Sequence, residues 1–376
     1  MSVFLAPDTY QAFQCKCGAC RSTCCRGWGI TVSMPEYFKL VGLPCGKHLR
    51  RRLDGAFHLV EHPTPERYAM IAPNWEGDCP LRARDGLCLL HKEQGEKALP
   101  SICRLYPRRI IGGACALSGS CEGVIEALLT REEPIRFVEI EEKSAAEPAH
   151  TPRNEGMAQF DRPLRLLSIG ILQDRRHHIA ERMMLLGRVM ADIYRYVRAQ
   201  DWAGMGTAIA ACAAEPAEAP KRVPYRQDVV EAAFKVAEVF SKNSESLAGD
   251  WAAGMQNLAR ADYPEMRRVF EQKHPNWERH FEHITVNHAF FSRFPYTDIH
   301  ADLMAEYAAL CAAHCVVMYL STIYTYDKEG LEPLADVIAA AFRMIEHSDF
   351  ARRAHIVFAR LGLGTQEKLD ELLCAL

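Results

Sequence analysis

The sequence predicts a mostly α-helical protein in which a small, irregular, cysteine-rich metal-binding module precedes an all-α domain. Fifteen cysteines occur in 376 residues, and eleven of them lie at or before Cys121. From about residue 160, apolar residues recur instead at spacings of three and four, the pattern of helices that bury one stripe. We therefore expect a cysteine-rich metal module over residues 1–131, a linker over 132–156 and an all-α domain over 157–376.

The predicted module is defined by its thiols. Five of them lie between Cys15 and Cys25, and later ones follow at irregular spacings. Thiolates are soft ligands that select zinc or iron–sulfur clusters. A disulfide scaffold is the usual use of dense cysteines in small secreted domains, whereas this chain is long and begins without an export signal. The sequence therefore favours a metal over disulfides.

The spacing also bears on which metal is bound. Zinc sites usually show paired C-x2-C knuckles. Here Cys24 and Cys25 are adjacent, and the remaining thiols extend over about a hundred residues, which is more typical of an iron–sulfur cluster. We expect a [4Fe–4S] cluster, with zinc as the alternative. Four ligands suffice for one cluster, so Cys17, Cys45 and Cys115 are set aside first, as partly buried thiols.

The predicted linker begins with a segment of strand-like alternation between apolar and polar residues, and its second part contains prolines. Residues 132–143 alternate like a short strand, whereas the following segment contains the turn and loop residues of a connector. Beyond it, one apolar stripe runs through Leu164, Leu167 and Ile171, and a second runs from Ile179 to Val197. Further helical stretches are expected at about 226–242, 245–260, 299–326, 331–347 and 349–361.

Composition narrows the class of partner. The net charge is −3, so no basic surface for nucleic acid or membranes is expected. No uninterrupted apolar run approaches the roughly 20 residues that span a bilayer. The first residues lack the basic and apolar regions of a signal peptide. We expect a cytoplasmic protein.

The order of the cysteine segments resembles the flagellin lysine-N-methylase family, which contains a domain similar to YkgJ-type zinc- or iron-chelating cysteine-cluster proteins. The matching features are, in chain order, Cys15, Cys20, Cys24-Cys25-x-Gly27-Trp28, Cys79-Pro80-Leu81, Gly86-Leu87-Cys88, Cys103-Arg104-x-Tyr106-Pro107-Arg108 and Ser120-Cys121-Glu122. Shorter matches follow in the helical part, at Gln173-Asp174-Arg175, Glu181-Arg182-Met183, Val286-Asn287-His288, Phe294-Pro295-Tyr296 and Glu346-His347.

The resemblance implies a protein-lysine N-methyltransferase that moves a methyl group from S-adenosylmethionine to lysine side chains of flagellin, with an iron–sulfur cluster involved. It also implies the metal ligands, which are drawn from Cys15, Cys20, Cys24, Cys25, Cys79, Cys88, Cys103 and Cys121. Cys17 is an additional thiol in the first motif, and Glu122-Gly123-Val124 departs from the Pro-Glu-Ala expected after the last cysteine.

The cofactor and catalytic sites cannot be assigned from sequence motifs. The chain has neither the Gly-rich loop of a dinucleotide-type fold nor the C-x3-C-x2-C spacing of radical S-adenosylmethionine enzymes. A base for lysine deprotonation would be Glu or His, and the histidine candidates are His288, His300, His314 and His347. Two other functions therefore stay open: a non-catalytic metal-binding protein and a cluster-containing redox enzyme.

Overall fold

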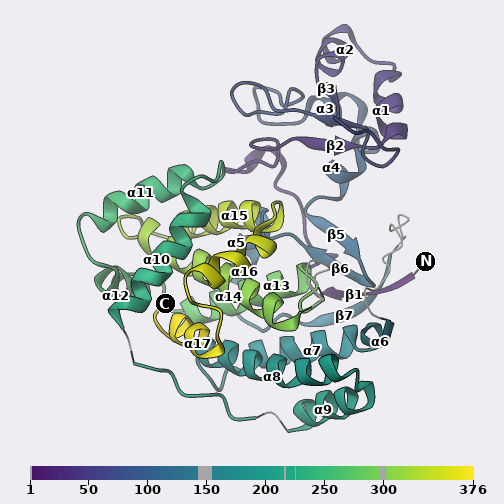
Figure 1. Ribbon diagram of the computed structural model, residues 1–376. Coiled ribbons are helices and arrows are strands. Elements are labelled where there is room, and N and C mark those ends of the chain that lie inside the picture. Colours follow the sequence, from purple (N-terminus) through teal and green to yellow (C-terminus); the bar gives the residue numbers. More distant parts are fainter. Residues whose placement is uncertain (1, 143–154, 216, 225, 297–301) are drawn as a thin grey trace. The chain divides into compact units, whose positions relative to one another are not determined.

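The computed structural model describes residues 2–142, 155–215, 217–224, 226–296 and 302–376 (Figure 1). The chain packs into two units. The first, here called the thiol unit, comprises Phe13–Arg109 and Cys121–Gly123. The second, here called the helical unit, comprises Met1–Ala12, Ile110–Ser120 and Val124–Leu376.

The thiol unit consists of short elements, as expected for a small, irregular, cysteine-rich module. A three-stranded antiparallel sheet has the order β2-β4-β3, and Ile30 pairs with Ile71 across its first two strands. Its strands are β2 (Ile30–Val32), β3 (Phe57–Leu59) and β4 (Ala69–Ile71). Its helices are α1 (Met34–Val41), α2 (Lys47–Asp54), α3 (Leu89–Gln94) and α4 (Ser101–Leu105), with 3-10 turns at Cys17–Ala19 and Glu96–Ala98.

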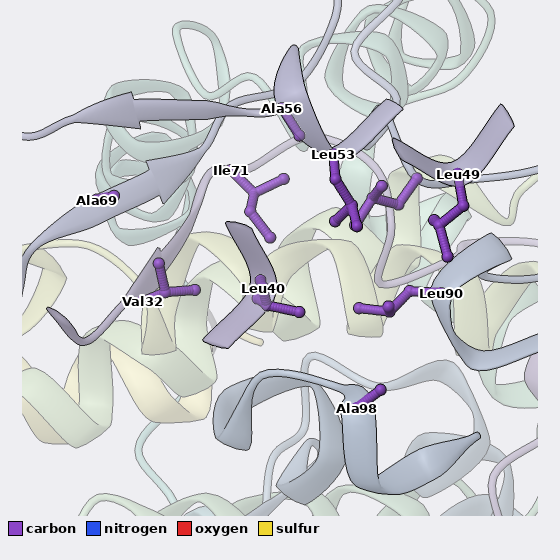
Figure 2. Close-up of a cluster of buried hydrophobic side chains, with 10 residues drawn as sticks. Val32, Leu40, Leu49, Leu53, Ala56, Ala69, Ile71, Leu90 and Ala98 are labelled. Carbon is purple, nitrogen blue, oxygen red and sulfur yellow. The ribbon is translucent and has the colours of Figure 1, made fainter. Parts of the chain in front are cut away.

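The core of the thiol unit is small, and thiols pack against it. Figure 2 shows this core, in which side chains from the sheet and from α1, α2 and α3 meet. Its buried members are Val32, Leu40, Leu49, Leu53, Ala56, Ala69, Ile71, Leu81, Leu90 and Ala98. Cys45, Cys79 and Cys88 are half-buried against it. The burial of a core this small stabilises the fold only modestly, so a bound metal would add to the stability of the unit.

The helical unit contains a four-stranded sheet of order β5-β6-β1-β7. The strands are β1 (Ser2–Pro7), β5 (Arg108–Ile111), β6 (Ala114–Leu117) and β7 (Phe137–Glu142). Strand β1 pairs in parallel with β6, at Leu5 and Ala114, and antiparallel with β7 along its whole length, from Ser2 opposite Glu142 to Pro7 opposite Phe137.

All other elements of this unit are helices where its residues are described (Figure 1). They are α5 (Glu122–Thr130), α6 (Glu155–Ala158), α7 (Asp161–Leu172), α8 (Ile179–Ala199), α9 (Trp202–Ala214), α10 (Gln227–Ser241), α11 (Ala248–Leu258), α12 (Tyr263–Lys273), α13 (Trp277–Phe291), α14 (Leu303–Tyr324), α15 (Glu332–Glu346), α16 (Phe350–Arg360) and α17 (Gln366–Cys374).

Helix α8 illustrates how the sequence specifies one of these elements. His178 and Glu181 form a capping box at its start, in which the His178 N–H donates to the Glu181 carboxylate at 3.0 Å. Its predicted apolar stripe is buried, and Gln200 ends the helix in a left-handed conformation. The capping box, the buried apolar stripe and the left-handed residue at the end therefore all specify the same helix.

Helix α14 is the one described helix that is long and apolar enough to cross a membrane by length and composition. It has 22 residues and a mean hydropathy of 1.6, but 94% of this apolar stretch is buried inside the protein. It contacts α8, α10, α11, α15 and α16, among others. Its apolar surface is therefore covered by neighbouring helices, as in a core helix.

The fold class is confirmed: a cysteine-rich module of short elements accompanies a helical domain, and residues 157–376 form only helices where they are described. The helical stretches predicted after residue 226 correspond to α10, α11, α14, α15 and α16, although 299–301 lie outside the described residues. The two units do not follow the boundaries predicted at residues 131 and 156, because β1 and β6 pack in the helical unit. The predicted strand within 132–142 is β7, and residues 143–154 of the expected linker lie outside the described residues.

Candidate functional site: the converging thiols and two buried carboxylate clusters

Short backbone pairings bring distant cysteines of the thiol unit together. The Cys79 N–H donates to the Cys25 carbonyl at 2.8 Å, next to a bridge between Arg26 and Asp78. A second bridge joins Arg82 to Cys88, and the Leu89 N–H donates to the Leu81 carbonyl at 2.8 Å. The segments around Cys25, Cys79 and Cys88 are therefore neighbours although 63 positions separate the first from the last.

Electrostatics identifies Cys25 as the common neighbour of one group of thiols. Charge on Cys25 acts on Cys24, Cys79, Cys88 and Cys103, and in each case it raises the pKa of the other thiol. These five sulfurs form the group that we call the central thiols. Their mutual repulsion as thiolates is the condition that a bound metal cation relieves, since metal ligation requires deprotonated cysteine.

Within the central thiols, Cys25 is the acidic member. The hydrogen bond from the Cys24 thiol lowers the pKa of Cys25 to about 7, and Thr23 and the positive charge of Arg82 act in the same direction. That same hydrogen bond, together with burial, raises the pKa of Cys24 well above its ordinary value. Burial raises the pKa of Cys79 to about 12. Cys25 is therefore the first of the five that would ionise and bind a metal.

The remaining three predicted ligands form a second group of thiols. Burial raises the pKa of Cys20 to about 11, and the charges of Glu122, Cys121 and Cys15 add to this effect. Cys15 also acts electrostatically on Cys24, which links the second group to the central thiols. In addition, the Cys17 N–H donates to the Cys15 sulfur at 3.3 Å, a contact that tunes metal-bound sulfurs.

Two buried or half-buried carboxylates anchor the segments that carry these thiols. Glu122, whose side chain is fully buried, accepts from the Lys16 ammonium at 2.6 Å and from the N–H groups of Ser22 and Arg21 at 2.6 and 3.2 Å. Glu36 caps α1 together with Ser33 and also accepts from the Ser101 N–H at 2.7 Å, at the start of the helix that carries Cys103.

The sequence motifs did not predict an anchoring role for Glu36 or Glu122. The Ser33-x-x-Glu36 capping-box pattern could have identified Glu36 as a cap, but only the fold brings it to Ser101. The arginine whose charge acts on Cys25 is Arg82, which lies between Cys79 and Cys88 and belongs to none of the sequence motifs singled out above.

The eight predicted ligands are all cysteine thiols, and their chemistry suits a metal group that is bound by thiolates. All eight predicted ligands lie in the thiol unit, and they include both groups just described. Among the described residues, however, no set of three or more His, Cys, Asp or Glu side chains is arranged to hold a metal ion as it stands. Of the cysteines set aside, Cys115 is fully buried in β6 of the helical unit and Cys45 packs on the small core.

The helical unit holds two buried carboxylate clusters, and the first is centred on Glu346 at the end of α15. Ser118 Oγ donates to Glu346 Oε2 at 2.6 Å and lies 2.5 Å from Ser120 Oγ. Ser120 Oγ is in turn 2.9 Å from His347 Nε2. On the other side, Glu346 Oε1 lies 3.4 Å from His288 Nδ1 of α13. The family-like matches at Ser120, His288 and Glu346-His347 therefore meet in one cluster.

The second cluster is centred on Glu282 of α13, whose side chain is completely buried. Arg175 donates to both of its oxygens at 2.8 to 3.1 Å, and Arg182 Nη1 donates to Oε2 at 2.6 Å. His283 Nδ1 lies 3.0 Å from the Leu128 carbonyl, and its Nε2 lies 3.1 Å from Arg175 Nη2. The matches at Arg175 and Arg182 thus hold one buried carboxylate and have a structural role.

The four histidines that the sequence suggested as candidate bases differ in their burial and surroundings. Burial lowers the pKa of His314 to about 3, and this residue lines a small cavity together with His288 and Phe281. His288 is also buried, and it contacts the Phe342 ring. His300 lies outside the described residues. His347 is exposed at the C-cap of α15.

Comparison with known proteins gives both a family and relatives. Residues 165–356 match the model of the FliB lysine N-methylase C-terminal domain. The chain is similar to a lysine-N-methylase of Salmonella typhimurium, with 31% identity over 104 residues that make up 27% of this chain and 25% of that protein. A flagellar biosynthetic protein FliU of Salmonella muenchen is 29% identical over 96 residues, which are 26% of this chain and 56% of that protein.

The matches differ in how much of the chain they cover. The alignments span about a quarter of the length of the lysine-N-methylases. No solved structure matches the chain. The family model, in contrast, covers half of the chain and includes Glu282, His288, Glu346 and His347. The chain therefore belongs to the flagellin lysine-N-methylase family.

Proposed function

We propose that this protein is a lysine N-methyltransferase that transfers methyl groups from S-adenosylmethionine to lysine side chains of flagellin. The observation that carries the proposal is the match of the lysine N-methylase model to residues 165–356. The name of the FliU relative, a flagellar biosynthetic protein, supports a flagellar substrate.

The reaction makes simple demands on the protein. The substrate ammonium loses a proton, and the amine lone pair then attacks the methyl carbon while the carbon–sulfur bond of the sulfonium breaks. The products are a methylated lysine and the thioether S-adenosylhomocysteine, and the proton passes to a base and then to water. The enzyme must therefore orient the amine in line with the methyl group and remove the proton.

We further propose that the thiol unit binds a [4Fe–4S] cluster, with zinc as the alternative metal. The ligands would come from Cys15, Cys20, Cys24, Cys25, Cys79, Cys88, Cys103 and Cys121, and the central thiols with their acidic member Cys25 support this choice. A bound cluster would supply a Lewis-acidic or redox-active centre and would stabilise the surrounding fold.

The test is methylation of purified flagellin from the same host by protein purified without oxygen. Incorporation of labelled methyl groups would be located by mass spectrometry of flagellin peptides, and iron, sulfide and zinc would be measured on the same sample. We expect methyl-lysine and about four iron and four sulfide per chain. Methyl-lysine formation by protein that carries only zinc would favour the alternative metal.

Two matched variants assign the role of the thiols. Cys103→Ser removes one of the central thiols, whereas Cys45→Ser changes a half-buried thiol of the same unit that the cluster is not expected to use. We expect metal and activity to fall in the first variant and to stay near wild type in the second. No transfer by metal-loaded wild-type protein would end the methyltransferase proposal, and electron transfer without methylation would favour a redox enzyme.

A further inference from the structure

An open cleft of about 620 Å³ lies in the helical unit, and a single loop supplies most of its lining. This loop, residues 131–136, joins α5 to β7 and forms neither helix nor strand. The volume falls within the range of small-molecule sites in proteins, roughly 300–1,000 Å³. The lining residues are Asp8, Arg131, Glu132, Glu133, Pro134 and Arg136. Since nearly all of them are charged, a ligand that fits this cleft is itself polar and charged.

Two of the lining residues hold the loop in one conformation. Arg131 donates through Nε to the Glu133 carbonyl at 2.6 Å and through Nη2 to the Pro134 carbonyl at 2.8 Å. Asp8, the residue after β1, donates its N–H to the Arg136 carbonyl at 2.8 Å. The loop is therefore fixed both by a side chain of its own and by the end of the neighbouring strand.

A family-like match in the helical part holds the rest of the loop. Gln173 Nε2 donates to the Ile135 carbonyl and Arg175 Nη1 donates to the Glu132 carbonyl, both at 3.0 Å. Every carbonyl from residue 132 to residue 136 thus accepts a hydrogen bond. A loop that is ordered in this way before the ligand arrives loses less conformational entropy on binding.

Because the loop carbonyls are occupied, the side chains determine what the cleft can bind. Asp8 Oδ2 accepts from Arg131 Nη2 at 2.8 Å and from Arg136 Nε at 3.3 Å. The Arg136 side chain is 82% exposed, so its terminal nitrogens face solvent. Glu132 and Glu133 are also exposed, and neither side chain forms an ion pair with another residue that the structure describes. The cleft therefore presents a guanidinium group together with two carboxylates.

These charges are complementary to those of one molecule in the proposed reaction. Asp8 neutralises one of the two arginines, which leaves one positive charge for an anionic group, whereas Glu132 and Glu133 attract two cationic groups. The methionyl part of S-adenosylmethionine carries one carboxylate, one ammonium and one sulfonium. Arginine binds carboxylates through paired N–H donors. A lysine side chain alone would use the glutamates and leave the arginine without a role.

We propose that this cleft binds the methionyl part of S-adenosylmethionine, with Arg136 on its carboxylate and Glu132 and Glu133 on its cationic groups. This inference rests on the proposed methyl transfer. The product, S-adenosylhomocysteine, keeps the carboxylate and the ammonium but has lost the sulfonium charge. The glutamates therefore hold the methyl donor more strongly than the product, which favours exchange of one for the other after each transfer.

The experiment is isothermal titration of the full-length, metal-loaded protein with S-adenosylmethionine, S-adenosylhomocysteine and free methionine, without flagellin. The wild type should bind the methyl donor more tightly than the product. Arg136→Gln should weaken the binding of both by about tenfold, because each loses a hydrogen-bonded partner of its carboxylate. Glu132→Gln combined with Glu133→Gln should weaken the methyl donor more than the product and so remove the preference.

Two matched controls change exposed charges elsewhere in the helical unit. Arg352→Gln in α16 and Glu231→Gln in α10 should leave all three affinities unchanged. The three substituted side chains of the cleft are exposed as well, so these variants should keep the unfolding temperature of the wild type. Thermal unfolding of every variant checks this.

The outcomes separate this inference from the proposed function. Wild-type affinities in Arg136→Gln and in the double glutamate variant would overturn the inference, even if flagellin is methylated, because the methyl donor then binds elsewhere. Binding of methionine but not of S-adenosylmethionine would also overturn it. If the methyl donor binds with the expected dependence on these side chains but no flagellin lysine is methylated, the proposed function fails and the binding site stands.

Discussion

At the residue scale, buried charged side chains connect several elements of the helical unit. Glu282 is fully buried and accepts four charge-assisted hydrogen bonds, three from Arg175 and one from Arg182. His283 beside it is neutral: its Nδ1–H can only donate to the Leu128 carbonyl, its Nε2 accepts from Arg175, and burial lowers its pKa. The Glu282 carboxylate therefore joins α13 to α8 and to the turn between α7 and α8, and His283 links the same cluster to the end of α5.

Removing this carboxylate should be costly. Glu282→Gln leaves the buried Arg182 and the partly exposed Arg175 without a counter-charge, and we expect a loss of about 3–5 kcal/mol in the free energy of unfolding, measured by urea titration. The control is Asp192→Asn, which breaks an exposed Asp192–Arg195 pair within α8 and should cost less than about 1 kcal/mol. Equal losses in the two variants would mean that the Glu282 cluster does not stabilise the unit.

At the scale of single elements, α13 is not among the helices that the sequence predicted. All of its residues from His280 to Phe291 are buried, and they include His280, Glu282, His283, Asn287 and His288. A helix buried on all sides has no polar face, so it has no apolar stripe to detect. The same helix contributes to both carboxylate clusters, which explains why its positions could not be assigned from periodicity.

Close helix packing gives a prediction at this scale. A Cβ on Gly187 of α8 would overlap the ring of the fully buried Tyr307, whose hydroxyl donates to the Met183 carbonyl at 3.0 Å. Gly187→Ala should therefore destabilise the protein by about 1–2 kcal/mol, because overpacking outweighs the gain in helix propensity. Gly170→Ala in α7 meets no atom within 4 Å and should stabilise by about 0.5–1 kcal/mol. Thermal unfolding of both variants checks the opposite signs.

At the scale of the whole molecule, the two units differ in how their stability arises. The helical unit buries long helices such as α13 and α14, whereas the thiol unit depends on a core of ten buried residues against which Cys79 and Cys88 pack. Metal-binding free energy is folding free energy where a core is this small.

Metal removal should therefore act on one unit. After chelation of the anaerobic protein, we expect hydrogen exchange in β2, β3 and β4 to accelerate by roughly tenfold or more, while exchange in α8, α13 and α14 stays unchanged. Mass spectrometry of peptides from the intact chain resolves the two units. Unchanged exchange in the three strands would show that the thiol unit folds without metal, and faster exchange in both units would show that their stabilities are coupled.

The sequence by itself determined the fold class, the position of the thiols and most of the amphipathic helices. These features follow from local rules: a spacing of three and four predicts a helix, and Ser33-x-x-Glu36 or His178-x-x-Glu181 marks a helix start. The family motifs could be recognised for the same reason, since Cys103-Arg104-x-Tyr106-Pro107 and its companions are contiguous in the chain.

Only the tertiary structure decided which distant residues act together. Strand β1 pairs with β6 and β7 more than a hundred positions later, so the unit boundaries could not follow from composition. Likewise, no spacing rule connects Ser118 to Glu346 or Arg175 to Glu282, because the burial of α13 and the packing of its neighbours create these contacts. A hydrogen bond depends on distance in space, and the sequence fixes that distance only through the complete fold.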